Sequence, residues 1–106
     1  GGSIFMSIYI SGPITSPDPD IMDANMAKFF VVQEELEKQG HEVFNPASQG
    51  KEGTWEYFIA RDLLWIFEHH PDMYFMEGWE DSKGARLEHE VAEMLHLKII
   101  YGDNSI

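Results

Sequence analysis

The chain has 106 residues, 19 of them acidic and 7 basic, and a formal net charge of −12. That length is typical of one domain, and the negative charge argues against a nucleic-acid partner because it repels a phosphate backbone. The absence of cysteine excludes disulfides, thiolate metal sites and cysteine nucleophiles. No apolar run approaches the roughly 18 residues of a membrane span and no secretory signal is visible, so we expect a cytoplasmic protein without a membrane partner.

The first elements in chain order are a strand and a helix. Ser7 to Ser11 is rich in β-branched and aromatic residues and predicts a strand. A helix is expected near Asp23 to Gln39, where apolar residues recur at helical spacing, and Gly40 after it is a favourable C-terminal cap. Before the strand, residues 1–5 open with Gly-Gly-Ser and resemble the remnant of an expression tag, so we expect a single domain over residues 6–106.

The remaining elements repeat this alternation. The other predicted strands are His41 to Asn45, Asp72 to Met76 and Lys98 to Tyr101; the other helices are Thr54 to Glu68 and Ser82 to His96. Ser82 is placed to act as an N-cap. Strands that alternate with helices predict an α/β domain, in which a parallel sheet of about four strands is covered on both faces and ligands bind at the carboxyl ends of the strands.

Glu88 lies where its predicted helix should present an apolar stripe. Its neighbours at helical spacing are small or aliphatic, namely Gly84, Ala85, Val91, Ala92 and Leu95. A carboxylate among such side chains resists ionisation and is a candidate acid, base or nucleophile. The alternatives are a side chain that reaches solvent, or a structural carboxylate paired with Arg61 or Arg86.

Asp62 shows the same anomaly on the second predicted helix, between Phe58, Ile59 and Ile66. A small roll of that helix would expose it instead. Two inward carboxylates permit a division of labour that is used at glycosidic carbons, in which one attacks or positions and the other holds a hydroxyl or transfers a proton.

The loops after the strands supply the candidate binding residues. They contain Ser11, Gly12 and Pro13 after the first strand, Asn45 after the second, and Trp79, Ser82 and Gly84 after the third. Ser82 either only caps its helix or, beside small residues, leaves free N–H groups that seat an anion. Trp79 either stacks on a base or covers the core, and any strand-to-helix turn can use Ser11-Gly12-Pro13.

His89, Glu93 and His96 fall on one helical face and could hold a divalent metal. No further ligand accompanies them, so a solvated helix face is the favoured interpretation. We expect neither a metal nor a cofactor.

In the order and spacing of these residues the chain resembles the nucleoside 2-deoxyribosyltransferase-like superfamily, which includes 2′-deoxynucleoside 5′-phosphate N-hydrolases. The matching elements are Ile8-Tyr9-Ile10-Ser11-Gly12-Pro13-Ile14, Asp62-Leu63, Asp72, and Ser82 through Glu88. They span nearly the whole chain. It looks most like the short bacterial and phage-encoded branch, in which a Gly-Trp-Glu loop precedes Ser-x-Gly-Ala-x-x-Glu.

The resemblance implies a flavodoxin-like, three-layer domain that forms a dimer or a dimer of dimers. It also implies cleavage of the N-glycosidic bond of a (deoxy)nucleoside or its 5′-monophosphate, with the sugar passed to water or to another base. Glu88 would then be the nucleophile, Asp62 would help to protonate the departing base or orient the sugar, and Tyr9 would orient Glu88. Ser82 and the Ser11-Gly12 turn would line the sugar or 5′-phosphate pocket.

The leading hypothesis is therefore a cofactor-free enzyme acting on a small nucleoside or nucleotide. A nucleotide-binding or sequestering protein without turnover is the alternative, and sequence does not separate the two because one fold hosts unrelated functions.

A homodimer is also expected from the helices themselves. Phe29, Phe30 and Val31 are consecutive and cannot all face the sheet, and Trp65 and Phe67 flank the inward face of the second helix. We expect this apolar surplus to lie on the outer sides of the first and second helices and to be buried between two copies. The resemblance implies that this interface lies near the substrate pockets.

Overall fold

The computed structural model of the protein describes residues 7–50 and 52–102. The expected tag remnant, residues 1–5, lies outside the described residues, and so do residues 6, 51 and 103–106 of the expected domain. The elements in order are β1 (Ser7–Ser11), α1 (Pro19–Lys38), β2 (Glu42–Phe44), η1 (Pro46–Gln49), α2 (Trp55–His69), β3 (Asp72–Met76), η2 (Trp79–Asp81), α3 (Lys83–Met94) and β4 (Ile99–Gly102). The segments η1 and η2 are short 3₁₀ helices.

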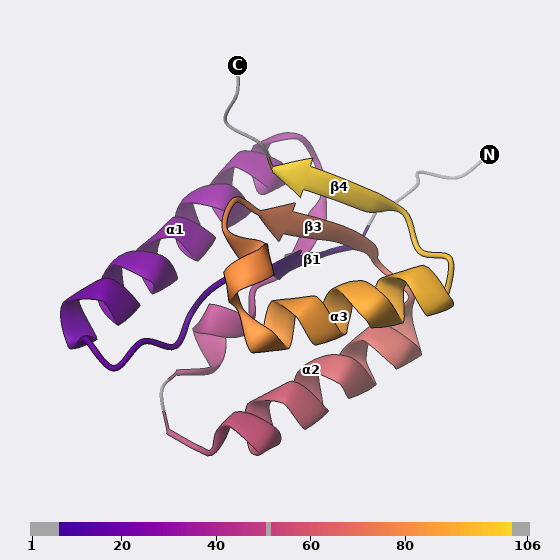
Figure 1. The fold of residues 1–106 in the computed structure, drawn as a ribbon. Helices are drawn as coiled ribbons and strands as arrows, with labels where there is room; N and C mark the ends of the chain where they lie inside the picture. Colours follow the sequence, from indigo (N-terminus) through magenta and orange to yellow (C-terminus); the bar gives the residue numbers. More distant parts are fainter. Residues whose placement is uncertain (1–6, 51, 103–106) are drawn as a thin grey trace.

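The four strands form one parallel sheet in the order β2-β1-β3-β4. α1 covers one face of this sheet, and α2 and α3 cover the other (Figure 1). The predicted α/β domain with a parallel sheet between helices is confirmed, and it has the three layers of a flavodoxin-like fold. Among the described residues, no helix is long and apolar enough to cross a membrane.

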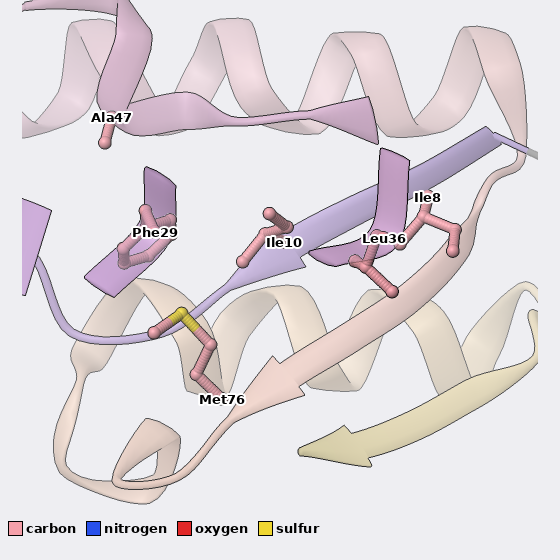
Figure 2. Close-up of a cluster of buried hydrophobic side chains, with 6 residues drawn as sticks. All are labelled: Ile8, Ile10, Phe29, Leu36, Ala47 and Met76. Carbon is pink, nitrogen blue, oxygen red and sulfur yellow. The ribbon is translucent and has the colours of Figure 1, made fainter. Parts of the chain in front are cut away.

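Alternation along β1 divides the core into two clusters. Ile8 and Ile10 point toward α1 and pack with its Phe29 and Leu36, as Figure 2 shows. Because successive strand side chains point to opposite faces, Tyr9 and Ser11 point toward α2 and α3. Tyr9 belongs to the second core cluster, together with Ile66 of α2, Met73 and Phe75 of β3, and Val91 and Ala92 of α3. The alternation along β1 therefore places two hydroxyl groups on the face of the sheet covered by α2 and α3, the helices that carry Asp62 and Glu88.

Capping decides where α1 begins and ends. It begins at Pro19 rather than near Asp23, because Asp18 acts as N-cap by accepting the Asp20 N–H at 2.9 Å and proline suits the first helical position. Its end is as predicted: Gly40 has a positive φ of 93° and donates its N–H to the Glu37 carbonyl.

The apolar surplus on the outer helix surfaces is confirmed except at one residue. Phe30, Val31 and Phe67 are 47%, 62% and 46% exposed. Trp65 was wrongly assigned to this surplus, because its ring stacks on Phe44 of β2 at a centroid distance of 4.5 Å and packs against the second core cluster.

Candidate active site

A cavity of about 450 Å³ lies at the carboxyl end of β1. Its lining comes from the loop after β1, from η1, from the first two turns of α2 and from the start of α3. This is the edge at which a parallel α/β sheet places ligand sites. Both predicted inward carboxylates, Glu88 and Asp62, line it.

Glu88 is held by two hydroxyl groups from β1. The Tyr9 hydroxyl donates to Oε2 at 2.6 Å, and Ser11 Oγ donates to Oε1 at 2.6 Å. Burial raises the pKa of Glu88 to about 8, and the negative charge of Asp62 adds to this, while the two hydroxyl donors act in the opposite direction. The expectation of an inward carboxylate is confirmed, since Glu88 is 5% exposed.

Tyr9 is fully enclosed between the two carboxylates. Burial raises its pKa well above the ordinary value for tyrosine, and the negative charges of Glu88 and Asp62 raise it further. The phenol therefore remains protonated at neutral pH and acts as a hydrogen-bond donor. The hydrogen bond from Tyr9 to Glu88 joins residues 79 positions apart in the chain.

Asp62 faces the cavity from α2. Gln49 Nε2 donates to its Oδ1 at 2.7 Å. Burial raises the pKa of Asp62, and hydrogen bonds from Gln49 and Tyr9 and the charge of Arg61 oppose that rise. Arg61 itself does not pair with Glu88 as one alternative had it: its guanidinium donates to Gln49 Oε1 at 3.1 Å and to the Tyr57 hydroxyl at 3.0 Å.

Five of the seven predicted binding residues line the cavity: Ser11, Gly12, Pro13, Ser82 and Gly84. Ser82 is the N-cap of α3, as predicted, because its Oγ accepts the Ala85 N–H at 3.2 Å. Gly12 lies close to the core, since an added Cβ would lie 3.1 Å from Met76 Cβ and Met76 would have to shift by a few tenths of an ångström to accommodate it. The turn after β1 is therefore packed tightly between the core and the cavity.

Two predicted binding residues, Asn45 and Trp79, lie outside this lining. Asn45 is buried and caps η1: its Oδ1 accepts the Ala47 N–H at 2.8 Å, and its Nδ2 donates to Gln33. Trp79 stacks on the His89 ring at 4.3 Å and packs against the second core cluster. Asn45 therefore shapes the loop that bounds the cavity, and Trp79 covers the core, which was the alternative considered for it.

Several lining residues were not among the predicted site residues, and they include Gln49, Trp55 and Lys83. Lys83 Nζ lies 3.9 Å from the centroid of the Trp55 ring, and both side chains line the cavity. With Phe58 and Ile59, Trp55 forms an apolar wall. A signal for Trp55 exists, because it lies seven residues before Asp62 and thus on the same helical face. Gln49 is the last residue of the short η1, which has no such periodicity.

In the alternative metal site of His89, Glu93 and His96, the His89 ring contacts both Tyr101 and Glu93. His89 Nε2 lies 2.7 Å from the Tyr101 hydroxyl, and its Nδ1 lies 3.4 Å from Glu93. Within residues 7–50 and 52–102, no group of three or more His, Asp or Glu side chains is placed to hold a metal ion.

No curated protein matches this chain. Residues 6–101 match the family model described as "Domain of unknown function (DUF4406)". This match covers most of the chain and every residue that lines the cavity. The protein therefore belongs to the DUF4406 family.

Proposed function

We propose that this protein cleaves the N-glycosidic bond of a nucleoside or of its 5′-monophosphate, with Glu88 as the nucleophile. The observation that carries the proposal is the setting of Glu88. It is a buried carboxylate that lines a cavity, and each of its oxygens accepts a hydroxyl hydrogen bond at 2.6 Å. Such a group is held in one orientation and is shielded from water, as a nucleophile in covalent catalysis requires. The resemblance to the nucleoside 2-deoxyribosyltransferase-like superfamily supports the same assignment.

The proposed reaction has two displacements. A carboxylate oxygen of Glu88 attacks the anomeric carbon, the carbon–nitrogen bond breaks, and its electron pair leaves with the base. A proton held by Asp62 neutralises the departing base. Water or a second base then attacks the anomeric carbon of the glycosyl ester, gives its proton to the Asp62 carboxylate and releases Glu88. Positive charge that develops on the sugar in each transition state favours an ionised Glu88 beside it.

The size and lining of the cavity suit such a substrate. Its volume of about 450 Å³ falls within the range of small-molecule sites. Trp55, Phe58 and Ile59 supply an apolar wall on which a flat aromatic base can stack, and the carboxylates and hydroxyls form the polar end. No cofactor takes part in this scheme.

The direct test is incubation with a panel of nucleosides and 5′-monophosphates, followed by chromatographic detection of free base. We expect Glu88→Gln to fold normally and to lose turnover by orders of magnitude, because the amide has nearly the same shape but cannot attack. Glu90→Gln, an exposed substitution on the same helix, is the matched control. A folded Glu88→Gln protein with near-normal base release would contradict the assignment.

One observation favours the alternative of a nucleotide-binding protein without turnover. A pKa of about 8 leaves most Glu88 protonated at neutral pH in the free protein, and a neutral carboxyl group is a poor nucleophile. The same panel separates the two functions. Tight binding of unaltered ligand at all pH values, without release of base, would support the binding protein.

A further inference from the structure

A chain of side-chain contacts runs from the protein surface to the inner end of the cavity. Arg61 Nε donates to Gln49 Oε1 at 3.1 Å, and Gln49 Nε2 donates to Asp62 Oδ1 at 2.7 Å. Asp62 in turn interacts with the Tyr9 hydroxyl, which donates to Glu88. Arg61 is exposed and does not line the cavity, whereas Gln49 and Asp62 do.

The contacts of Arg61 define which way the Gln49 amide points. Arginine can only donate hydrogen bonds, and an ionised aspartate can only accept them. A reversed amide would direct its NH₂ group at the guanidinium and its oxygen at the carboxylate, and both contacts would be repulsive. Arg61 is itself held on its other side, because its Nη1 donates to the Tyr57 hydroxyl at 3.0 Å. Gln49 Nε2 also donates to the Pro46 carbonyl at 3.3 Å, which adds a second restraint.

We propose that Gln49 is a positioning residue for Asp62, and that Arg61 acts on Asp62 through the Gln49 amide. The role in catalysis rests on the proposed function; the role in holding Asp62 does not. Because a donated N–H occupies Oδ1, a proton on Asp62 is directed to Oδ2. The hydrogen bonds from Arg61 to Gln49 and from Gln49 to Asp62, which we call the relay, therefore set the rotamer of the Asp62 carboxyl group. They also set which of its oxygens carries the proton.

The relay opposes the effect of the surroundings of Asp62, which disfavour a negative charge on its carboxyl group. The charged or titratable groups around Asp62 are Tyr9 on β1, Glu88 on α3 and Arg61 on α2, with Asp81 and Lys83 in the same cavity lining. Burial disfavours ionisation of Asp62, and the N–H of Gln49 favours it. Loss of that N–H must therefore keep Asp62 protonated to a higher pH.

The test is a titration of Asp62 by nuclear magnetic resonance, with carboxyl-¹³C aspartate and with Asp62→Asn to assign the signal. We expect Gln49→Ala to move the Asp62 midpoint upward by about half a unit or more. Gln49→Glu keeps the side-chain shape but cannot donate when ionised, so it should move the midpoint in the same direction and serves if the alanine variant folds poorly. An unchanged midpoint in a folded Gln49 variant overturns the proposal.

A double-variant comparison separates the relay from simple attraction between charges. Arg61→Ala should raise the Asp62 midpoint in the wild-type background and raise it less when Gln49 is already alanine, because residues that act through one another are not additive. Equal shifts in both backgrounds would show that Arg61 acts by its charge alone and overturn that half of the proposal. Arg86→Ala, which removes an exposed arginine outside the cavity lining, should leave the midpoint unchanged.

Kinetic measurements test the catalytic half separately. Where base is released, Gln49→Ala should lower kcat by roughly ten-fold for the poorest leaving base, and less for good ones, with KM nearly unchanged. An equal loss for all bases would overturn the catalytic role. The titration needs no turnover, so a protein that releases no base defeats the proposed function and leaves the positioning of Asp62 to be decided by the titration.

Discussion

Burial raises the pKa of Glu88 to about 8, so the charge of one side chain depends on pH in the range where most proteins are assayed. The Tyr9 and Ser11 hydroxyls oppose this rise, because their hydrogen bonds favour the ionised carboxylate. Two properties of the protein therefore depend on the ionisation of Glu88: the rate of the proposed reaction and the stability of the fold.

The rate of base release should follow the ionisation of Glu88. If the ionised form attacks, kcat/KM for a base that leaves without a proton from Asp62 should rise with pH and level off above about 8, since this quantity reports on the free enzyme. Ser11→Ala and Tyr9→Phe each remove a donor that lowers the pKa of Glu88, so both should move the midpoint to higher pH. A profile measured with one substrate across this range is sufficient. A flat or falling profile would contradict attack by an ionised Glu88.

The stability of the fold should also depend on the ionisation of Glu88, but the contribution of Glu88 to stability should fall as pH rises. The pKa of Glu88 is higher in the folded state than its ordinary value of 4.5, so the folded state binds the proton more tightly. The stabilisation is fully present below pH 4.5, declines as pH rises, and is lost above about 8. Each unit of pKa difference corresponds to about 1.4 kcal/mol.

Glu88→Gln should therefore become progressively more stable than the wild type as pH rises from 4.5 to about 8. Denaturant unfolding at several pH values measures this difference. Glu90→Gln, which is exposed, should show no comparable trend. A stability difference for Glu88→Gln that is constant with pH would show that burial does not perturb its ionisation.

At the scale of elements, helix ends show how local sequence controls the framework of the site. Two residues beyond the last residue of α1 lies Gly40, with φ of 93°, and two residues beyond the last residue of α3 lies His96, with φ of 56°. Both residues occupy the left-handed region that terminates a helix, and only glycine adopts it without steric cost. α3 carries Glu88, so its end bears on the site.

Reciprocal substitutions at these two caps should have opposite effects. His96→Gly should stabilise the protein by roughly 0.5 to 1 kcal/mol, and Gly40→Ala should destabilise it by about 1 kcal/mol. Thermal or denaturant unfolding of both variants tests this. A loss of stability in His96→Gly would mean that contacts of the histidine side chain outweigh the backbone strain.

At the scale of the whole molecule, α2 has apolar side chains on two faces. One face packs on the core through Ile66 and presents Asp62 to the cavity. On the other, Tyr57, Leu64 and Phe67 are 49%, 59% and 46% exposed, at positions seven and ten residues apart along one helical side. An exposed apolar stripe of this kind usually marks a partner surface.

We propose that a second copy of the chain covers the exposed apolar stripe of α2, formed by Tyr57, Leu64 and Phe67, and that the two copies form a homodimer. Light scattering at micromolar concentration should give a dimer mass for the wild type and a monomer mass for Leu64→Glu. Met94→Glu places the same charge at an exposed apolar residue on α3 and should remain dimeric. Salt should strengthen the dimer, because it screens the repulsion between copies with a net charge of −12. A wild-type monomer mass would remove the argument.

Local sequence was sufficient for the features that depend on neighbouring residues. The alternation of strands and helices, the cap at Gly40, the N-cap at Ser82 and the inward orientation of Glu88 and Asp62 all follow from period and capping chemistry over a few turns. The start of α1 was misplaced because Asp18 and Pro19 extend the helix beyond its apolar pattern. These features come from interactions within one element, so a single stretch of chain specifies them.

The chain by itself thus determined which elements form and which carboxylates they bury, but tertiary structure alone decided which side chains meet. Ser11 and Glu88 are 77 positions apart, and they come into contact because α3 packs on the face of β1 toward which Ser11 points. Gln49 reaches Asp62 from the end of η1, a single 3₁₀ turn that is too short for a periodic pattern to reveal the direction of its side chain. Trp79 does not line the cavity as predicted, because the conformation of the segment after β3 places its ring on His89. Contacts between distant segments depend on sheet order and loop geometry, which no local pattern encodes.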